Sequence, residues 1–353
     1  MSNQVVNKNN FYGVFTTFLI FLTPTITFGI FESDLSPFYL IVLFLIQAKF
    51  NLFEFVVLGY LFLITAISSI ILKDFQLTKL SFVILMSYFL INLNKSNFFK
   101  QNLLFITSVI WCSSGIITLF NPNIFSFFIY RIGYTIGRGA VGFTPEPAFY
   151  GLSSVFLYGL CRQYFLFTKD TKIKFSIFLF TISTFISLSF YAILIFILIS
   201  VFYIKLRFNL LKIIMFLFFI IFIVYLSENL SKLRIFSLIN IILKNPGFIL
   251  NDHSIMYRFN SFIDIYDALT FNSTGKKGLT SGFSLIFYQF NYFSIIFIFL
   301  YFLILKVNLL PLFKISFLLI FFVLLFIGPM SIPYFWIWLS SLAYIKKDNM
   351  IKI

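Results

Sequence analysis

The sequence predicts an all-α, polytopic integral membrane protein with about 12 (11–12) transmembrane helices, forming a single transmembrane domain over residues 1–353. Three observations predict this class. Hydrophobic residues make up 61 % of the chain, including 57 Phe, whereas charged residues make up 10 %. The mean hydropathy is +1.02. Long apolar runs follow one another along the chain, and a soluble domain could not bury so much apolar surface.

The expected helices are read from these runs, because a helix needs roughly 20 apolar residues to cross a bilayer. The stretch 173–204 is too long for one upright helix and short for two. We expect two short helices that turn near residues 187–189, which gives twelve spans, whereas one long tilted helix would give eleven. The twelve runs lie at roughly 11–31, 35–50, 52–72, 78–93, 101–121, 147–167, 173–187, 188–205, 209–227, 281–306, 309–328 and 331–345.

The distribution of positive charge predicts the orientation. With both termini cytoplasmic, 16 of the 26 basic residues fall in inner segments and two in short outer turns. Short loops set the orientation, and cytoplasmic loops carry the excess of Lys and Arg. The net charge of +15 is therefore mainly a topology signal, and we expect the bilayer as a partner and no nucleic acid. The predicted location is the bacterial inner (cytoplasmic) membrane.

The remaining eight basic residues lie in two longer outer loops, 122–146 and 228–280. The first is rich in Arg and Gly. The second, late in the chain, is too long to be a mere connection, and its helical periodicity predicts an interfacial helix near 255–270.

The first loop offers Arg131 and Arg138 as candidate anion-binding residues. Arginine binds phosphate or pyrophosphate at two points. The glycines around them allow the backbone to approach a ligand closely and turn amide groups inward. The alternative is that both arginines contact lipid headgroups. The glycines concerned are Gly133, Gly137, Gly139 and Gly142.

Glu146 lies between Pro145 and Pro147 at the start of a predicted helix, which places it at or near the N-cap. One interpretation is a capping carboxylate stabilised by the helix dipole. The other is a base that accepts a proton from an acceptor hydroxyl at the membrane surface. Both can hold together.

The second loop adds Arg258 and His253. Arg258 falls among the apolar residues of the expected interfacial helix, where a cation is costly unless it snorkels or meets an anion. His253 is the only histidine, and it is either structural or a base or phosphate contact. We expect no metal site, because no Cys, His or carboxylate stands at metal-ligand spacing from His253. Cys112 and Cys161 are expected to be core residues.

The chain resembles the bacterial O-antigen polymerases, which are related to the O-antigen ligases. The resemblance covers the whole layout of spans with a large outer loop late in the chain. One local match is RGAVG at 138–142 followed by EPAFY at 146–150. A second is HS at 253–254 with Arg258, ahead of SGF at 281–283. Relatives often place an arginine after the serine of a mid-chain turn, whereas here Phe190 follows Ser189.

This resemblance implies a GT-C-like glycosyltransferase that polymerises undecaprenyl-pyrophosphate-linked repeat units into O-antigen, capsule or exopolysaccharide on the periplasmic face. Arg138 and Arg258 would hold the donor pyrophosphate with support from Arg131, and Glu146 or His253 would activate the acceptor hydroxyl. No cofactor is implied, because the donor carries its own activation. A chain-length regulator and a flippase of the same pathway would be partners.

Three alternatives stay open at this point. An O-antigen ligase would transfer the glycan to a lipid A core. A lipid-linked oligosaccharide flippase or other transporter predicts charged residues within spans, an internal repeat and short outer loops, and the sequence shows the opposite pattern. A non-catalytic membrane subunit would tolerate loss of Arg138 and Arg258 alike.

Overall fold

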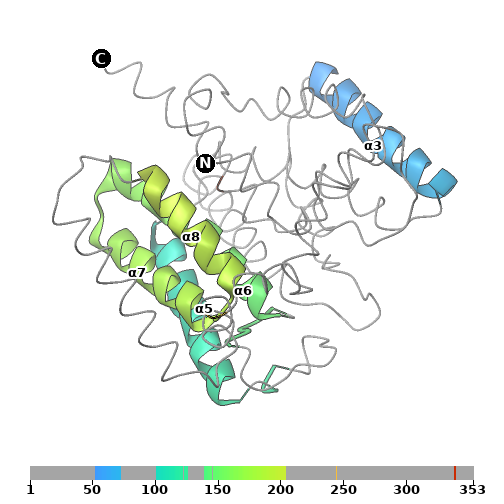
Figure 1. Ribbon diagram of the computed structural model, residues 1–353. Coiled ribbons are helices and arrows are strands. Elements are labelled where there is room, and N and C mark those ends of the chain that lie inside the picture. Colours follow the sequence, from blue (N-terminus) through green and yellow to red (C-terminus); the bar gives the residue numbers. More distant parts are fainter. Residues whose placement is uncertain are drawn as a thin grey trace, which may run out of the picture.

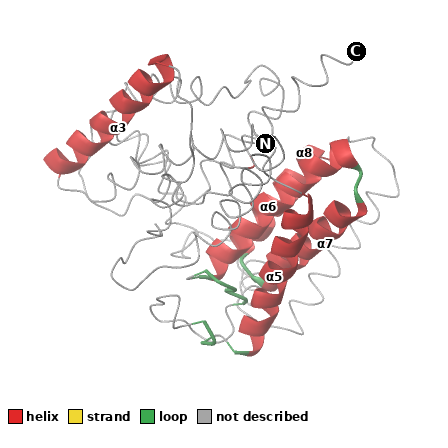
Figure 2. Cartoon of the chain, turned by 180° about the vertical axis from the view of Figure 1, so that it is seen from behind, coloured by secondary structure: helices red, strands yellow, loops and turns green. Residues whose placement is uncertain are grey.

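The computed structural model describes residues 52–72, 101–121, 123–125, 139–144, 146–203, 244 and 338. Throughout the described residues the regular structure is helical (Figure 2). In Figure 1 the helices between residues 101 and 203 lie side by side as a bundle, and the helix at residues 52–72 lies apart from them. The helices are α3 (Leu52–Leu72), α5 (Gln101–Phe120), α6 (Pro147–Thr168), α7 (Thr171–Ile186) and α8 (Phe190–Tyr203).

The ends of α5 and α6 follow from local sequence. After α5, Asn121 donates its backbone N–H to Ile117 O at 2.9 Å. Its side-chain Oδ1 accepts the Asn123 N–H at 3.2 Å, which forms an Asx turn. Pro147 opens α6 as its first helical residue, where no N–H is needed. Lys169 ends α6 in the left-handed region, with φ of 50°.

Short polar segments separate α6 from α7 and α7 from α8. Asp170 caps α7 by accepting the Lys172 N–H at 2.8 Å. Ser187 and Leu188 form a turn in which Leu188 has φ of 49°, a conformation that cannot continue a right-handed helix. The Ser189 hydroxyl then accepts the Ala192 N–H at 3.3 Å at the start of α8. This turn confirms the expected break near residues 187–189.

The bundle has two chemically different ends. Helices α5 and α7 run parallel, with Ser108 and Ser176 hydroxyls 3.2 Å apart and Gly115 close to Ile186. Helix α6 runs the other way and packs against both. At one end, Lys172 Nζ donates to Asn102 Oδ1 at 2.8 Å, beside the α6–α7 turn with Lys169. At the other end lie the start of α6 and the α7–α8 turn.

Large side chains and small hydroxyl residues share the core. Tyr150, Phe156 and Phe180 are fully buried, and Trp338 from late in the chain stacks on Phe156 at 5.8 Å. Trp338 Nε1 donates to the Tyr203 hydroxyl at 2.9 Å. Buried Ser and Thr hydroxyls mostly bond to carbonyls of their own helix, so they bring no unpaired donor into these interfaces and let the helices approach closely.

The five described helices coincide, to within about two residues at each end, with five of the expected runs, so the helix predictions there are confirmed. By length and composition, Asn102–Phe120 is the one described helix able to cross a membrane, and Tyr191–Ser200 is a shorter apolar helix. The total of 11 or 12 spans remains a prediction. The expected spans at 11–31, 35–50, 78–93, 209–227, 281–306 and 309–328 lie outside the described residues, as do the interfacial helix near 255–270 and, apart from Trp338, the run 331–345.

Candidate functional site

Segment 139–144 lies inside the bundle and joins three helices. Ala140, Val141, Gly142 and Thr144 are all buried. The Ala140 N–H donates to the Ile186 carbonyl at the end of α7, at 2.8 Å. The segment therefore meets the α7–α8 turn at one of its ends and the start of α6 at the other.

Thr118 of α5 holds the middle of this segment. Its hydroxyl oxygen accepts the Gly142 N–H at 2.9 Å and the Val141 N–H at 3.3 Å. The same hydroxyl donates to the Gly115 carbonyl at 2.9 Å, so its proton is used within α5. Thr118 is 1 % exposed. One buried side chain therefore accepts hydrogen bonds from two backbone amides of the segment.

The two described glycines of the loop serve packing between protein groups. Gly139 has φ of +104°, and a Cβ there would overlap the Ser187 carbonyl. Gly142 has φ of +50°, and its Cβ would run into the Tyr150 ring. We expected these glycines to allow a ligand close to the backbone. At these two positions the close neighbour is the protein itself; Gly133 and Gly137 lie outside the described residues.

Tyr150 fixes the start of α6 against α5. Its hydroxyl donates to the Trp111 carbonyl at 2.8 Å, and its ring stacks on Trp111 with centroids 5.3 Å apart. Trp111 Nε1 donates in return to the Ser154 hydroxyl at 2.9 Å. Gly115 leaves room for the phenol, because a Cβ there would overlap the Tyr150 hydroxyl. These contacts fix the first two turns of α6 against α5.

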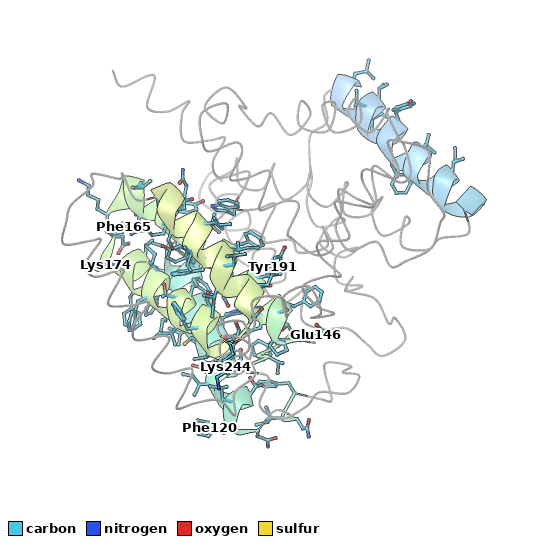
Figure 3. The ribbon with its side chains drawn as sticks, in the orientation of Figure 1. Phe120, Glu146, Phe165, Lys174, Tyr191 and Lys244 are labelled. Atoms are coloured by element: carbon cyan, nitrogen blue, oxygen red, sulfur yellow. The ribbon has the colours of Figure 1, made fainter. Side chains whose placement is uncertain are left out.

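Glu146 occupies the N-cap of α6, as expected, with φ −142° and ψ 152°. Its carbonyl accepts the Tyr150 N–H at 3.1 Å and the Thr144 hydroxyl at 2.9 Å. Its carboxylate makes no capping hydrogen bond to α6, and the residue is exposed. Figure 3 shows Glu146 at the edge of the bundle. The backbone caps the helix here, and the carboxylate is presented outward at the positive end of the helix dipole.

The other predicted site residues, Arg131, Arg138, His253 and Arg258, lie outside the described residues. Arg138 immediately precedes Gly139 in the chain, so the anchored segment begins at its peptide bond. Both cysteines are buried and free, as expected. Within the described ranges, no group of three or more His, Cys, Asp or Glu could hold a metal ion.

The sequence did not predict that Thr118 and Ser187 contact segment 139–144. Thr118 stands 23 positions before Val141, in a helix that also contains Thr107, Ser108 and Ser114. A Thr in such a helix usually bonds its own preceding turn, which Thr118 also does, so its sequence context does not show the second role. Its distant amide partners emerge only from the packing.

Comparison with protein-family models, with curated proteins and with solved structures gives no match.

Proposed function

We propose that the chain is a membrane glycosyltransferase that joins polyprenyl-pyrophosphate-linked oligosaccharide repeat units on the outer face of a bacterial cytoplasmic membrane. Its product would be an O-antigen, capsule or exopolysaccharide, and its substrates two copies of an undecaprenyl-pyrophosphate-linked glycan. In this proposal the protein crosses the membrane about 12 times, and both of its termini lie in the cytoplasm.

The observation that carries the proposal is the buried, anchored segment 139–144. It separates Arg138 from Glu146, the two best candidates in the first loop for anion binding and proton transfer. A long polar loop would normally leave such residues mobile, yet the segment between them is held by α5, α7 and α6. Rigid support of this kind is what a site needs to hold reacting groups in a fixed geometry.

The α7–α8 turn gives a second line of support. In the family that the chain resembles, an arginine often follows the serine of a mid-chain turn. Here the mid-chain turn contains Ser187, whose carbonyl lies against Gly139, the residue after Arg138. The two stretches that carry cations in the relatives therefore meet in this chain, although Phe190 replaces the second arginine.

The exposed side chains of the bundle support a membrane setting. Helix α5 buries Leu104, Trp111 and Thr118 but exposes large apolar residues on its other face. Such a face is costly in water and favourable against acyl chains. The residues concerned are Ile106, Val109, Ile110, Ile116, Ile117 and Leu119.

The chemistry that these residues would perform is a substitution at a sugar carbon. The acceptor hydroxyl attacks the anomeric carbon of the donor, a new glycosidic C–O bond forms, and the bond to the pyrophosphate breaks. Glu146 takes the hydroxyl proton. The leaving group departs as polyprenyl pyrophosphate, and Arg138 with Arg258 stabilises the charge that develops on it. Arg131 would support them, and His253 is the alternative base.

The first experiment replaces each of the two candidate donor-binding arginines, Arg138 and Arg258, in cells that lack the native gene. Arg138→Ala and Arg258→Ala should abolish polymer lengthening while single-repeat lipid-linked glycan accumulates on the outer face. Arg138→Lys should recover only part of the activity, because lysine keeps the charge but loses the planar fork. A polysaccharide gel reads the ladder of chain lengths.

The matched control is Lys174→Ala, which removes an exposed cation near the opposite end of the bundle and should leave the ladder intact. Full-length ladders from both arginine variants would contradict the proposal and favour a non-catalytic subunit. Loss of single-repeat glycan from the outer face would instead indicate a flippase.

A further inference from the structure

We infer that Thr118 is a positioning residue for the reaction, acting through the backbone of segment 139–144. The inference rests on the proposed function, because it takes Arg138 and Glu146 as the groups that are positioned. Its own basis is the geometry at the Thr118 hydroxyl.

The Thr118 hydroxyl makes three hydrogen bonds, one as donor and two as acceptor. It donates to the Gly115 carbonyl at 2.9 Å, which leaves its lone pairs for the Val141 and Gly142 amides at 3.3 and 2.9 Å. The site is closed to water, since Thr118 is 1 % exposed and Val141 is fully buried. Loss of this acceptor would remove a hydrogen bond from each of two buried amides, which is costly in a site closed to water.

The neighbouring contacts show where the segment would move. On either side of Gly142 the backbone lies against the Thr144 hydroxyl, whose single proton is shared between Val141 O at 2.8 Å and Glu146 O at 2.9 Å. Before it, Ala140 is held by Ile186 O at 2.8 Å. Thr118 is thus the residue through which α5 holds segment 139–144. Releasing the segment would remove the support that lies between Arg138 and Glu146 in the chain.

The direct test compares Thr118→Val with Thr118→Ser in the full-length protein in lipid nanodiscs. Valine keeps the shape but removes the acceptor, whereas serine keeps the hydroxyl. The matched control is Thr107→Val, a buried threonine on the same face of α5, about three turns earlier. Amide hydrogen exchange of peptides covering 139–144 should rise about tenfold or more in Thr118→Val, as expected for loss of a buried acceptor. It should stay unchanged in the other two variants.

The functional reading uses the single-repeat polyprenyl-pyrophosphate glycan as substrate. Thr118→Val should lower kcat, per folded molecule, about tenfold or more while KM for the glycan changes little, because misplaced charge stabilisation affects the transition state most. Thr118→Ser should restore kcat. A merely structural role would reduce the amount of folded protein and leave its kcat unchanged.

Three results would overturn the inference in distinguishable ways. Equal kcat in Thr118→Val and Thr107→Val removes the positioning role while the proposed function stands. Unchanged hydrogen exchange in Thr118→Val shows that the hydroxyl does not hold the segment. No elongated product from the wild-type protein means that the proposed function fails, and the positioning role fails with it.

Discussion

At the scale of single residues, the described part of the Arg/Gly-rich loop uses its glycines to bring backbone against side chains. Gly139 sits against the Ser187 carbonyl, and Gly142 against the Tyr150 ring. Both have positive φ, which a residue with a Cβ adopts only at a cost. The sequence predicted a ligand close to these glycines, whereas at Gly139 and Gly142 the close neighbours are protein atoms. Glycine spacing carries no information about such distant partners.

Gly142→Ala should therefore destabilise the folded protein. The new methyl would meet the Tyr150 ring in a position already strained by φ of +50°. We expect a loss of about 1–3 kcal/mol, the usual range for overpacking and for a strained backbone position. Thermal unfolding of the detergent-solubilised protein measures it.

Gly59→Ala is the matched control for this substitution. Nothing lies within 4 Å of a Cβ at Gly59, in the middle of α3. Alanine should there be neutral or stabilising by up to ~1 kcal/mol, because glycine is the poorer helix former. Equal effects of the two substitutions would show that Gly142 is not packed as described.

Glu146 raises a separate question at this scale. Its carboxylate is exposed and makes no capping bond to α6, so Glu146→Gln should leave the melting temperature nearly unchanged. If the carboxylate is the base, the same substitution should strongly reduce polymer lengthening on a polysaccharide gel. Full activity with unchanged stability would leave His253 as the candidate base.

At the scale of helices, five segments are predictable from apolar length and from local stop signals. Pro147 begins α6, Asp170 caps the start of α7, and the polar turn at 187–189 divides a run of ambiguous length. These signals are local, which is why sequence reveals them. The packing of segment 139–144 between α5 and the α7–α8 turn is not local. This packing depends on Thr118 and Ile186, which are far from the segment in sequence, and no periodic pattern in the sequence predicts it.

Lys169 offers a test of helix termination. It ends α6 with φ of 50° and donates its N–H to Phe165 O at 3.1 Å, the position where helices favour glycine. Lys169→Gly should stabilise the protein by about 0.5–1 kcal/mol, since glycine adopts the left-handed region without strain.

The comparison variant Lys174→Gly should act in the opposite direction. Lys174 is exposed within α7, where glycine costs about 1 kcal/mol. Opposite shifts in thermal unfolding would support the described boundary between α6 and α7. A loss of stability in both variants would contradict it.

At the scale of the whole molecule, orientation is the property that charge predicts best. The α6–α7 turn with Lys169 and the loop with Lys244 are expected on opposite sides of the membrane. Both lysines are exposed, and both native cysteines are buried. In spheroplasts, a membrane-impermeant thiol reagent should label Lys244→Cys directly and Lys169→Cys only after permeabilisation. The reverse pattern would invert the predicted topology.

The central claim is that the protein itself lengthens a lipid-linked glycan. The most direct measurement places the purified chain in lipid vesicles with single-repeat polyprenyl-pyrophosphate glycan as the only substrate. We predict products of two or more repeats, with one polyprenyl pyrophosphate released for each linkage formed, and none of either from Arg138→Ala. Movement of the unaltered single repeat across the bilayer, without elongation, would contradict the claim and identify a transporter.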